Sequence, residues 1–457
     1  MKKKTVKPGS LVYVWFNRFS ENLLLLTGKA NYVFGSHMIQ RILKTSPLVS
    51  VVVVDHNGSH FWPDLIDGLE TQSFKDFEVV LVENGGRVEI GSQQHSFSIR
   101  RIVTDTNIGF SQGCNLGWVK SEGEFVAFLN NDTTLGERWL EMLVRRAEES
   151  RENAIVASKI LFDKRCAFFD VASPTYIPSM VGSGEDRRRL GIRLNLGGYS
   201  LLLHLQKNVH FPELVSANYW IWTKEKSEIA LFESDDGAYR VEFWAPEQHD
   251  GKFVCFATKS GKRTFVKAKG RSNEVVEITA ENSESGYLVN SAGCSISENW
   301  LVEETGLYEL DNGRFDEPRE LEAASACSIL VRKSSFSGEL PFDPAFFAYY
   351  EDVDFCRKAR ARGYRIIYEP KSVVYHKRSG TAGVQSAFQV FHSTRNRFWV
   401  IAKHAPWKVV LKSMWGEMRN LDWYAPWLDD EFSLSRLKRE TWLGFAKRVW
   451  WRLTDAE

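Results

Sequence analysis

Apolar and polar positions follow two different periods along residues 48–150, and together these periods predict the fold class. Short, nearly unbroken apolar runs are typical of buried parallel strands. Such runs occur at 48–54, 77–82, 99–103 and 124–129. Apolar residues spaced three or four positions apart are typical of a helix with one buried face, and they occur at 62–72, 110–121 and 137–150. Strands and helices that alternate in this order form βαβ units, so we expect an α/β fold with a mostly parallel sheet.

The helical spacing fades between about residues 163 and 287. Short β-rich segments replace it, separated by polar, turn-like stretches, at 240–244, 252–258, 264–268 and 274–279. We therefore expect an inserted, β-sandwich-like module. The α/β pattern then returns, with a strand at 324–331, a helix at 352–362 that ends before Gly363, and a strand at 364–368 that stops before Pro370.

Tryptophan and basic residues are interleaved from Pro406 to the end of the chain. Trp442 and Trp450 mix with Lys447 and Arg448 in this segment, which predicts a basic amphipathic helical tail. Two interpretations remain open: a peripheral contact with a membrane surface, or a helix that packs on the protein's own core.

Length and composition narrow the class of protein. A chain of 457 residues is too long for one hydrophobic core, so two or three packed units are expected. The net charge of +1 gives no reason to expect nucleic acid as a partner, and no signal indicates an oligomeric state. The six cysteines include no C-x-x-C pair, which favours reduced core thiols and a cytoplasmic compartment. The apolar runs after the initial Met-Lys-Lys-Lys are too short for a secretion signal, and none reaches the roughly 18 residues that span a bilayer.

Polar residues with ligand-binding chemistry follow the strand at 124–129. The chain continues there as Asn130-Asn131-Asp132-Thr133. Ligands of an open α/β sheet bind at the carboxyl ends of its strands, and a hard cation such as Mg²⁺ or Mn²⁺ prefers oxygen ligands. The alternative interpretation is a simple Asx turn.

A second cluster follows the aromatic run that begins at Phe346. Glu351, Asp352 and Asp354 stand at the start of the predicted helix. Acids in a first turn stabilise the helix dipole, but a carboxylate walled by aromatic rings also suits proton abstraction from a hydroxyl. Like charges raise the pKa of a carboxyl group, so Glu351 and Asp354 are expected to make Asp352 more basic. His376, at the end of a later strand-like segment, is either structural or a metal ligand.

The order of these motifs resembles the family 2 inverting glycosyltransferases of the GT-A fold, and especially their rhamnosyltransferase-like branch. The matching segments, in chain order, are 51–57, 82–85, 107–115, 129–133, 290–293, 349–354, 375–376 and 395–397. The resemblance implies a Rossmann-like GT-A catalytic domain whose nucleotide-binding half spans 48–163 and whose acceptor half spans 288–404. A lead-in at 1–47, the β-rich module at 164–287 and the helical tail at 405–457 complete the expected organisation.

The resemblance also implies a role for each matching residue. Asp352 corresponds to the general base with Glu351 beside it, while Asp132 and His376 correspond to ligands of Mg²⁺ or Mn²⁺. The positions that contact the nucleotide donor correspond to Asn57, Glu83, Asn84, Asn107, Gly109, Asn115 and Asn131. This sequence departs from the family pattern in two places, with Asp55-His56 in place of Thr-Tyr and Glu83 in place of Asp.

The expected activity is transfer of a sugar, with rhamnose as the sugar that the branch implies, from a nucleotide-diphosphate donor. The expected acceptor is a hydroxyl of a glycan or lipid-linked glycan in cell-surface polysaccharide synthesis, at the inner face of the cytoplasmic membrane. One alternative is a non-catalytic sugar-binding or scaffold protein on a degenerate transferase domain, against which Asp132 and the Glu351-Asp352 pair argue. The other is a nucleotidyltransferase, which would need a Lys- or Arg-bearing phosphate loop where this chain has residues 55–60.

Overall fold

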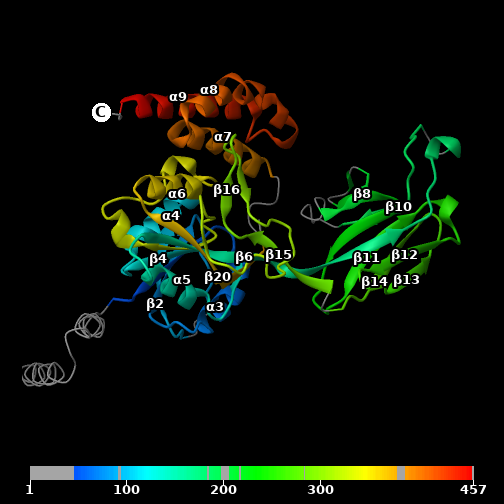
Figure 1. Ribbon diagram of the computed structural model, residues 1–457, viewed down its shortest axis with the longest axis horizontal. Helices are drawn as coiled ribbons and strands as arrows, with labels where there is room; N and C mark the ends of the chain where they lie inside the picture. The colour runs from blue at the N-terminus through cyan, green and yellow to red at the C-terminus, as the bar shows by residue number, and fades with distance from the viewer. Residues whose placement is uncertain are drawn as a thin grey trace, which may run out of the picture. The chain divides into compact units, whose positions relative to one another are not determined.

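The computed structural model describes residues 46–90, 94–182, 185–196, 205–210, 212–215, 218–281, 284–377 and 386–454 (Figure 1). The chain divides into residues 1–48 and 49–457, and the second unit contains all the elements described below. Nearly all of the lead-in expected at 1–47 therefore lies outside the described residues.

Four parallel strands form the centre of the sheet. They are β1 (Val49–Asp55), β2 (Phe77–Asn84), β3 (Ser98–Thr104) and β4 (Phe125–Asn130), in the order β3–β2–β1–β4. The connecting helices are α3 (Trp62–Glu70), α4 (Gly109–Lys120) and α5 (Trp139–Glu148). The strand order reverses between β1 and β4, which is where a doubly wound sheet binds its ligands. The α/β fold with a parallel core is thus confirmed.

Two glycines let α4 lie close against β1. A Cβ atom at Gly113 would come within 2.7 Å of Val54 Cγ1, and one at Gly117 within 2.3 Å of Val52 Cγ1. Both distances are far below van der Waals contact, so a larger residue would push the helix away from the sheet.

The other side of β4 carries mixed strands from the later part of the chain. β19 (Ser328–Arg332) pairs antiparallel with both β4 and the long strand β6 (Asn153–Ala172), and β20 (Arg365–His376) runs parallel to β6. Shorter strands complete this part: β5 (Thr133–Leu135), β16 (Cys294–Ile296), β17 (Val302–Glu304) and β18 (Arg319–Glu320).

The expectation that a strand stops before Pro370 is wrong. β20 continues through this proline to His376, because the register with β6 shifts between Glu369 and Val373. A proline cannot donate to a ladder, and a bulge is one of the few places where a strand tolerates it.

The β-rich region has its own core. β11 (Tyr239–Ala245), β12 (Phe253–Thr258), β13 (Arg263–Lys267) and β14 (Ser272–Ile278) match the four expected segments. The remaining strands there are β7 (Arg193–Asn195), β8 (Lys207–Val209), β9 (Glu213–Val215), β10 (Asn218–Phe232) and β15 (Ser285–Ser291). Phe169, Phe243 and Phe256 belong to a buried cluster separate from the one under the parallel sheet.

β6 belongs to both regions (Figure 1). It pairs parallel with β20 at one end and antiparallel with β10 and β12 at the other, while β15 lies along it antiparallel from Ile160 to Ala167. Because the pairings of β10 and β12 with β6 are antiparallel, these strands do not continue the parallel sheet. The division of the chain at 164 and 287 stays a prediction.

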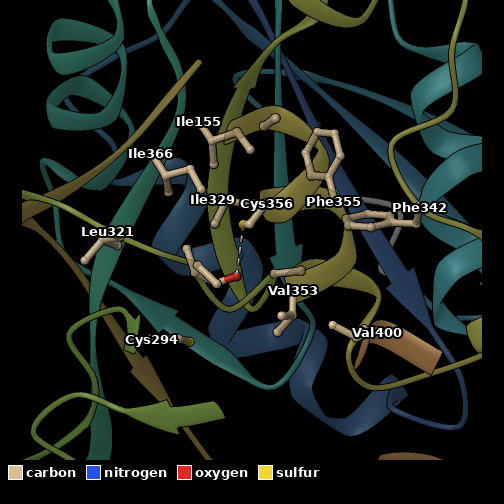
Figure 2. Close-up of a cluster of buried hydrophobic side chains, with 14 of the residues drawn as sticks. Ile155, Cys294, Leu321, Ile329, Phe342, Val353, Phe355, Cys356, Ile366 and Val400 are labelled. Carbon is tan, nitrogen blue, oxygen red and sulfur yellow. Dashed lines mark hydrogen bonds between the residues drawn. The ribbon is translucent and has the colours of Figure 1, made fainter. Parts of the chain in front are cut away.

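The helix α6 (Glu351–Ala361) begins directly above the main core. Val353, Phe355 and Cys356 point into that core (Figure 2), where the Cys356 thiol donates to the Ala324 carbonyl over 3.9 Å. Burial of these three side chains holds the first turn of α6, with Glu351 and Asp352, in place.

The C-terminal region is helical. It comprises α7 (Ala387–His404), α8 (Trp407–Trp415), the 3₁₀ segment η9 (Glu417–Trp427) and α9 (Leu434–Thr454). Short 3₁₀ turns elsewhere are η2 (Ser59–Phe61), η3 (Pro178–Met180), η5 (Glu247–His249), η7 (Lys333–Phe336) and η8 (Pro344–Phe346). None of the helices within the described ranges is long and apolar enough to cross a membrane.

Candidate active site

Asp55 organises the carboxyl end of β1. Its buried carboxylate accepts hydrogen bonds from the Gly58 amide (3.1 Å), Trp62 Nε1 (2.8 Å) and Asn131 Nδ2 (2.7 Å). β1 and β4 are neighbours, with Val54 opposite Asn130, so this contact joins two strand ends at the reversal point. The departure at position 55 therefore has a structural reason, since its carboxylate orients Asn131.

The segment after β1 lies very close to the side chain of Asn131. A Cβ atom at Gly58 would lie 2.0 Å from Asn131 Nδ2, so only glycine fits there. Asn57 is exposed and adopts a left-handed backbone (φ 58°), which asparagine tolerates well. His56 Nδ1 donates to the Asn84 carbonyl over 2.8 Å and ties this segment to the end of β2.

Asn84 holds the loop that leads into α4. Its Nδ2 donates to Asn107 Oδ1 over 3.0 Å, and its Oδ1 accepts from the Ile108 amide over 2.8 Å. Asn107 Oδ1 also accepts from the Gly109 amide over 2.9 Å. Gly109 has φ of 84°, and a Cβ atom there would lie 2.7 Å from the Phe347 carbonyl oxygen. Asn84 is thus buried and positions the loop, while Asn107 is exposed at its tip.

Glu83 and Asn115 bind protein groups in this structure. The buried Glu83 carboxylate accepts from Arg101 Nε (2.6 Å), Arg101 Nη2 (2.9 Å) and the Val88 amide (2.9 Å). The bonds from Arg101 are the main cause of a lowered Glu83 pKa. Asn115 donates to the Phe342 carbonyl over 2.7 Å and accepts from its amide over 3.1 Å. Contact of either side chain with a nucleotide stays a prediction.

Asp132 and His376 lie together at the carboxyl ends of β4 and β20. Asp132 Oδ1 is 3.2 Å from His376 Nε2, and both side chains are buried. His376 Nδ1 is 3.5 Å from Asn290 Oδ1. Burial lowers the pKa of His376, but the neighbouring Cys327 and Asp132 outweigh it and hold that pKa well above its ordinary value. The structure therefore joins two residues that are far apart in the sequence and that the resemblance assigned to one metal site.

Glu351, which is buried, and Asp352, which is partly buried, form an adjacent acid pair. The Asp352 carboxylate accepts from the Ala326 amide (3.1 Å) and from its neighbour Val353 (2.8 Å), and burial raises its pKa. Glu351 is buried, and its Oε2 has no hydrogen-bond partner among the described residues. Burial, with the nearby Asp352 and Asp354 charges, raises the Glu351 pKa well above its ordinary value.

Asp354 does not act on Asp352 as the sequence suggested. Its buried carboxylate pairs with Lys358 (2.6 Å), Lys403 (2.7 Å) and His404 (2.7 Å). Burial raises the pKa of Asp354, but these cationic partners outweigh it and hold that pKa far below its ordinary value. Asp354 is not among the causes that raise the Asp352 pKa, of which burial is the leading one.

The segment before α6 is strained. Phe347, Tyr349 and Tyr350 all have left-handed backbones, with φ of 67°, 67° and 69°. Each such residue costs about 1–3 kcal/mol and persists only where its surroundings impose it. Asn396 Nδ2, from α7, lies 2.9, 2.8 and 2.7 Å from the carbonyl oxygens of Phe346, Ala348 and Tyr349. We call residues 346–350 the acid loop, because they lead directly into Glu351.

Residues 326 and 327 connect the acid pair to the Asp132–His376 pair. The Ala326 amide donates to Asp352, and the next residue, Cys327, contacts His376. The Cys327 carbonyl also accepts from the Asn130 amide over 2.9 Å. Two consecutive residues, Ala326 and Cys327, thus contact the two pairs.

Sequence reasoning missed three positioning residues. Asp55 was noted only as a departure, Arg101 was not singled out, and Asn396 was noted within a motif without a role. A polar residue that directly follows an apolar strand, as Asp55 does, was the available signal. Arg101 and Asn396 carry no local signal, because their partners are 18 residues or more away.

Comparison with known proteins shows a similarity to one family of enzymes over part of the chain. Residues 50–198 match the model of glycosyl transferase family 2. The chain is 26% identical over 138 residues to the "Uncharacterized glycosyltransferase EpsJ" of Bacillus subtilis (strain 168), covering 29% of this chain and 38% of that one. It is 25% identical over 118 residues to the cholesterol galactosyltransferase of Borreliella burgdorferi, covering 25% of this chain and 33% of that one. The match thus spans well under half the length of these relatives.

Among solved structures, a crystal structure of GalNAc-T7 with UDP, GalNAc and Mn²⁺ aligns over 90% of this chain and 58% of that chain, with 12% identity and a TM-score of 0.42. At that TM-score the structural alignment does not support the similarity to the family, which rests on the sequence matches and on the parallel sheet. Residues 50–198, which include β2 to β4, all of β1 except Val49, and Asp132, are thus similar to glycosyl transferase family 2.

Proposed function

We propose that this protein transfers a sugar from a nucleotide-diphosphate donor to an acceptor hydroxyl with inversion at the anomeric carbon. The observation that carries the proposal is the position of the Glu351–Asp352 pair. It is one short backbone segment away from Asp132 and His376, at the ligand-binding edge of the sheet. A proton acceptor and a diphosphate site at such a separation suit a single in-line displacement.

Asp352 is the proposed proton acceptor. It is partly buried and its carboxylate is oriented by two backbone amides, so it is held ready to bond to an incoming hydroxyl. Burial raises its pKa and so makes it a stronger base than an exposed aspartate. As the hydroxyl oxygen bonds to the anomeric carbon, its proton passes to Asp352 and the bond to the donor diphosphate breaks on the opposite face. Glu351, buried beside it, is the proposed second acid of the site.

Asp132 and His376 are the proposed protein ligands of Mg²⁺ or Mn²⁺. Their facing atoms are 3.2 Å apart, a separation that suits two ligands of one ion. No group of three or more His, Cys, Asp or Glu that could hold a metal occurs within the described ranges. The residues therefore fit an ion that completes its coordination with substrate phosphates and water, as Mg²⁺ commonly does. When bound, the ion would neutralise negative charge on the leaving diphosphate.

Four finer assignments belong to the proposal. Rhamnose is the donor sugar that the motif resemblance implies. A glycan or lipid-linked glycan of cell-surface polysaccharide is the proposed acceptor, and the inner face of the cytoplasmic membrane is the proposed place of action. Asn57 and Asn107, both exposed at the same sheet edge, are proposed to contact the nucleotide. The β-rich module is proposed to bind glycan or to mediate assembly.

A donor screen tests the function. Purified protein is incubated with nucleotide sugars, rhamnose donors included, and release of nucleoside diphosphate is measured with Mg²⁺, with Mn²⁺ and with excess chelator. We expect release only with a metal, and we expect Asp132→Ala and His376→Ala to weaken donor binding and reduce release. Asp235→Ala, at a side chain 99% exposed in the β-rich region, is the matched control and should behave as wild type.

Two outcomes would count against the proposal. Full activity in excess chelator would show that Asp132 and His376 have another duty. Sugar binding without any diphosphate release, from every donor in the screen, would favour the non-catalytic scaffold instead.

A further inference from the structure

The C-terminal helices expose an unusual set of side chains. Every tryptophan that is exposed within the described ranges lies between residues 407 and 451. We call this set the tryptophan face; it consists of Trp407, Trp415, Trp423, Trp427, Trp450 and Trp451. Trp423 is 74% exposed and Trp450 is 62% exposed, whereas Trp62 and Trp139 of the catalytic region are almost completely buried.

Poor packing of the tail does not explain why these tryptophans are exposed. α9 packs against α7 so closely that a Cβ atom at Gly444 would lie 2.3 Å from the Trp399 ring. Leu437 and Phe445 of α9 are buried in the same packing. In α8, by contrast, Trp407, Leu411 and Trp415 recur every four residues and are all exposed, so they form one stripe along that helix. Some side chains of the tail therefore pack on the protein's own core while others are exposed at its surface, as each of the two interpretations requires.

Charge in this region favours one kind of partner. Residues 406–454 contain nine Lys and Arg against six Asp and Glu. Three of the acids are already paired, Glu417 with Arg397, Asp422 with Lys438, and Glu440 with Arg395. Lys408, Arg439 and Lys447 are exposed. Indole rings favour the headgroup region of a bilayer, and basic side chains near them are attracted to anionic lipids.

The tryptophan face is rigidly connected to the acid loop. The Arg448 guanidinium of α9 lies 3.9 Å from the Trp399 ring centroid and 5.6 Å from that of Phe346. Arg395 of α7 bonds to Glu440 of α9 over 2.7 Å and to the Phe346 carbonyl over 3.0 Å. The helix α9, which carries Trp450 and Trp451 of the face, is thus connected through Arg448 and Arg395 to the loop that leads into Glu351.

We infer that the tryptophan face docks on a bilayer that carries anionic lipids, and that it holds the acid loop near that surface. The docking itself follows from the exposed indoles and the basic surplus. Its consequence, that the acceptor is carried by a lipid in that bilayer, rests on the proposed function.

Vesicle flotation of the full chain tests the docking. The vesicles contain phosphatidylcholine alone or phosphatidylcholine with phosphatidylglycerol, at low and high salt. We expect flotation with the anionic vesicles at low salt and its loss at high salt, because the charge attraction is screened. The variant Trp415→Ala/Trp423→Ala/Trp450→Ala should float at least about tenfold less, since attachment scales with the buried apolar area.

The control variant is Phe253→Ala/Phe265→Ala, which removes two side chains exposed by 62% and 60% on the β-rich region. It should float as wild type does. All substituted positions are exposed, so thermal unfolding monitored by circular dichroism should match wild type for both variants.

Donor hydrolysis without lipid separates the two proposals. Hydrolysis that persists in a protein that never floats would overturn the docking and leave the proposed function standing. Flotation without hydrolysis of any donor would support the docking and overturn the proposed function. Concentration-dependent dimerisation that the triple tryptophan variant abolishes, with no vesicle binding, would overturn docking in favour of a second copy as the partner.

Discussion

Two adjacent carboxyl groups in different surroundings define the chemistry at the scale of single residues. Asp352 receives two backbone amides, while one Glu351 oxygen has no partner among the described residues. Burial raises both pKa values, and Glu351 is affected far more strongly. We assign proton abstraction to Asp352, because two backbone amides orient its carboxylate and its side chain is only partly buried.

Replacing Asp352 with asparagine should abolish transfer while donor binding stays nearly intact. The amide keeps the shape of the side chain but cannot accept a proton, so the rate should fall by about 10²–10⁴. Single-turnover transfer and donor titration measure the two effects separately. Glu351→Gln is the matched variant, and a larger loss there than in Asp352→Asn would move the base to Glu351.

The raised pKa of Glu351 predicts a pH-dependent stability. A carboxyl group whose pKa is higher in the folded than in the unfolded chain stabilises the fold below its unfolded pKa, and this contribution is lost as the pH rises toward the folded value. Glutamine does not titrate, so a chain with glutamine at this position does not lose stability in this way as the pH rises. Glu351→Gln should therefore be more stable than wild type at neutral pH, by about 1.4 kcal/mol for each unit of pKa shift, and the gain should vanish near pH 4.

Urea unfolding across this pH range measures the difference. Glu339→Gln, at a carboxylate 52% exposed and paired with Arg362, serves as the control for the substitution itself. A stability gain for Glu351→Gln that did not change with pH would show that titration of this carboxyl group is not its cause.

At the scale of elements, α7 positions the loop that leads into Glu351 and Asp352. Asn396 and Arg395 from this helix hold the carbonyl groups of the acid loop, whose backbone is left-handed at three positions that are not glycine. Such strain is stable only where surrounding contacts impose it. We therefore regard Asn396 as a positioning residue for the start of α6.

Asn396→Ala should slow transfer more than it weakens donor binding, because the acid loop relaxes while the sheet edge is unchanged. Loss of the buried amide should also cost about 1–3 kcal/mol of unfolding free energy. Asn420→Ala is the matched control, since Asn420 is exposed and its amide reaches only the Gly416 carbonyl over 3.3 Å. Equal losses of donor affinity and rate in Asn396→Ala would contradict a role confined to the loop.

At the scale of the whole molecule, one strand carries two separate cores. β6 contributes Ile155 to the cluster under the parallel sheet and Phe169 to the cluster of the β-rich region. Between these two positions, the buried Lys159 pairs with Asp311 over 3.0 Å. Most residues of each core come from strands and helices that the other core does not share, so we expect damage to one core to spread only weakly to the other.

Two substitutions, each of which creates a cavity in one of the two cores, test whether the cores are independent. Phe243→Ala and Phe128→Ala each empty a fully buried phenylalanine site, one per core, and each should cost about 3–5 kcal/mol locally. Hydrogen exchange should show that Phe243→Ala loosens the β-rich region while donor hydrolysis persists, and that Phe128→Ala abolishes hydrolysis. Equal loosening of both regions by Phe243→Ala would show that the chain unfolds as one unit.

The sequence by itself determined the elements of residues 48–150 and four strands of the β-rich region, but the long strand β6 and the helix α7 were not predicted. Apolar runs, short β-rich segments and the helical period are local patterns, so the four parallel strands, their helices and the four segments of the β-rich region were predicted to within a few residues. The order of the short motifs also indicated the family, because each motif is a contiguous run. The continuation of β20 through Pro370 was missed, since the bulge that permits it is a property of its pairing with β6.

The tertiary structure alone decided which of these residues meet. Asp55 orients Asn131 across 76 residues of sequence, and Arg101 donates to the Glu83 carboxylate across 18. Asn396 donates to carbonyl groups of the acid loop across about 50 residues. The tertiary structure also paired Asp354 with Lys403 and His404, and it made burial, rather than the Asp354 charge that sequence reasoning had invoked, the leading cause of the raised Asp352 pKa. The physical reason is that pairing, burial and pKa depend on distance in space, whereas the sequence records only distance along the chain.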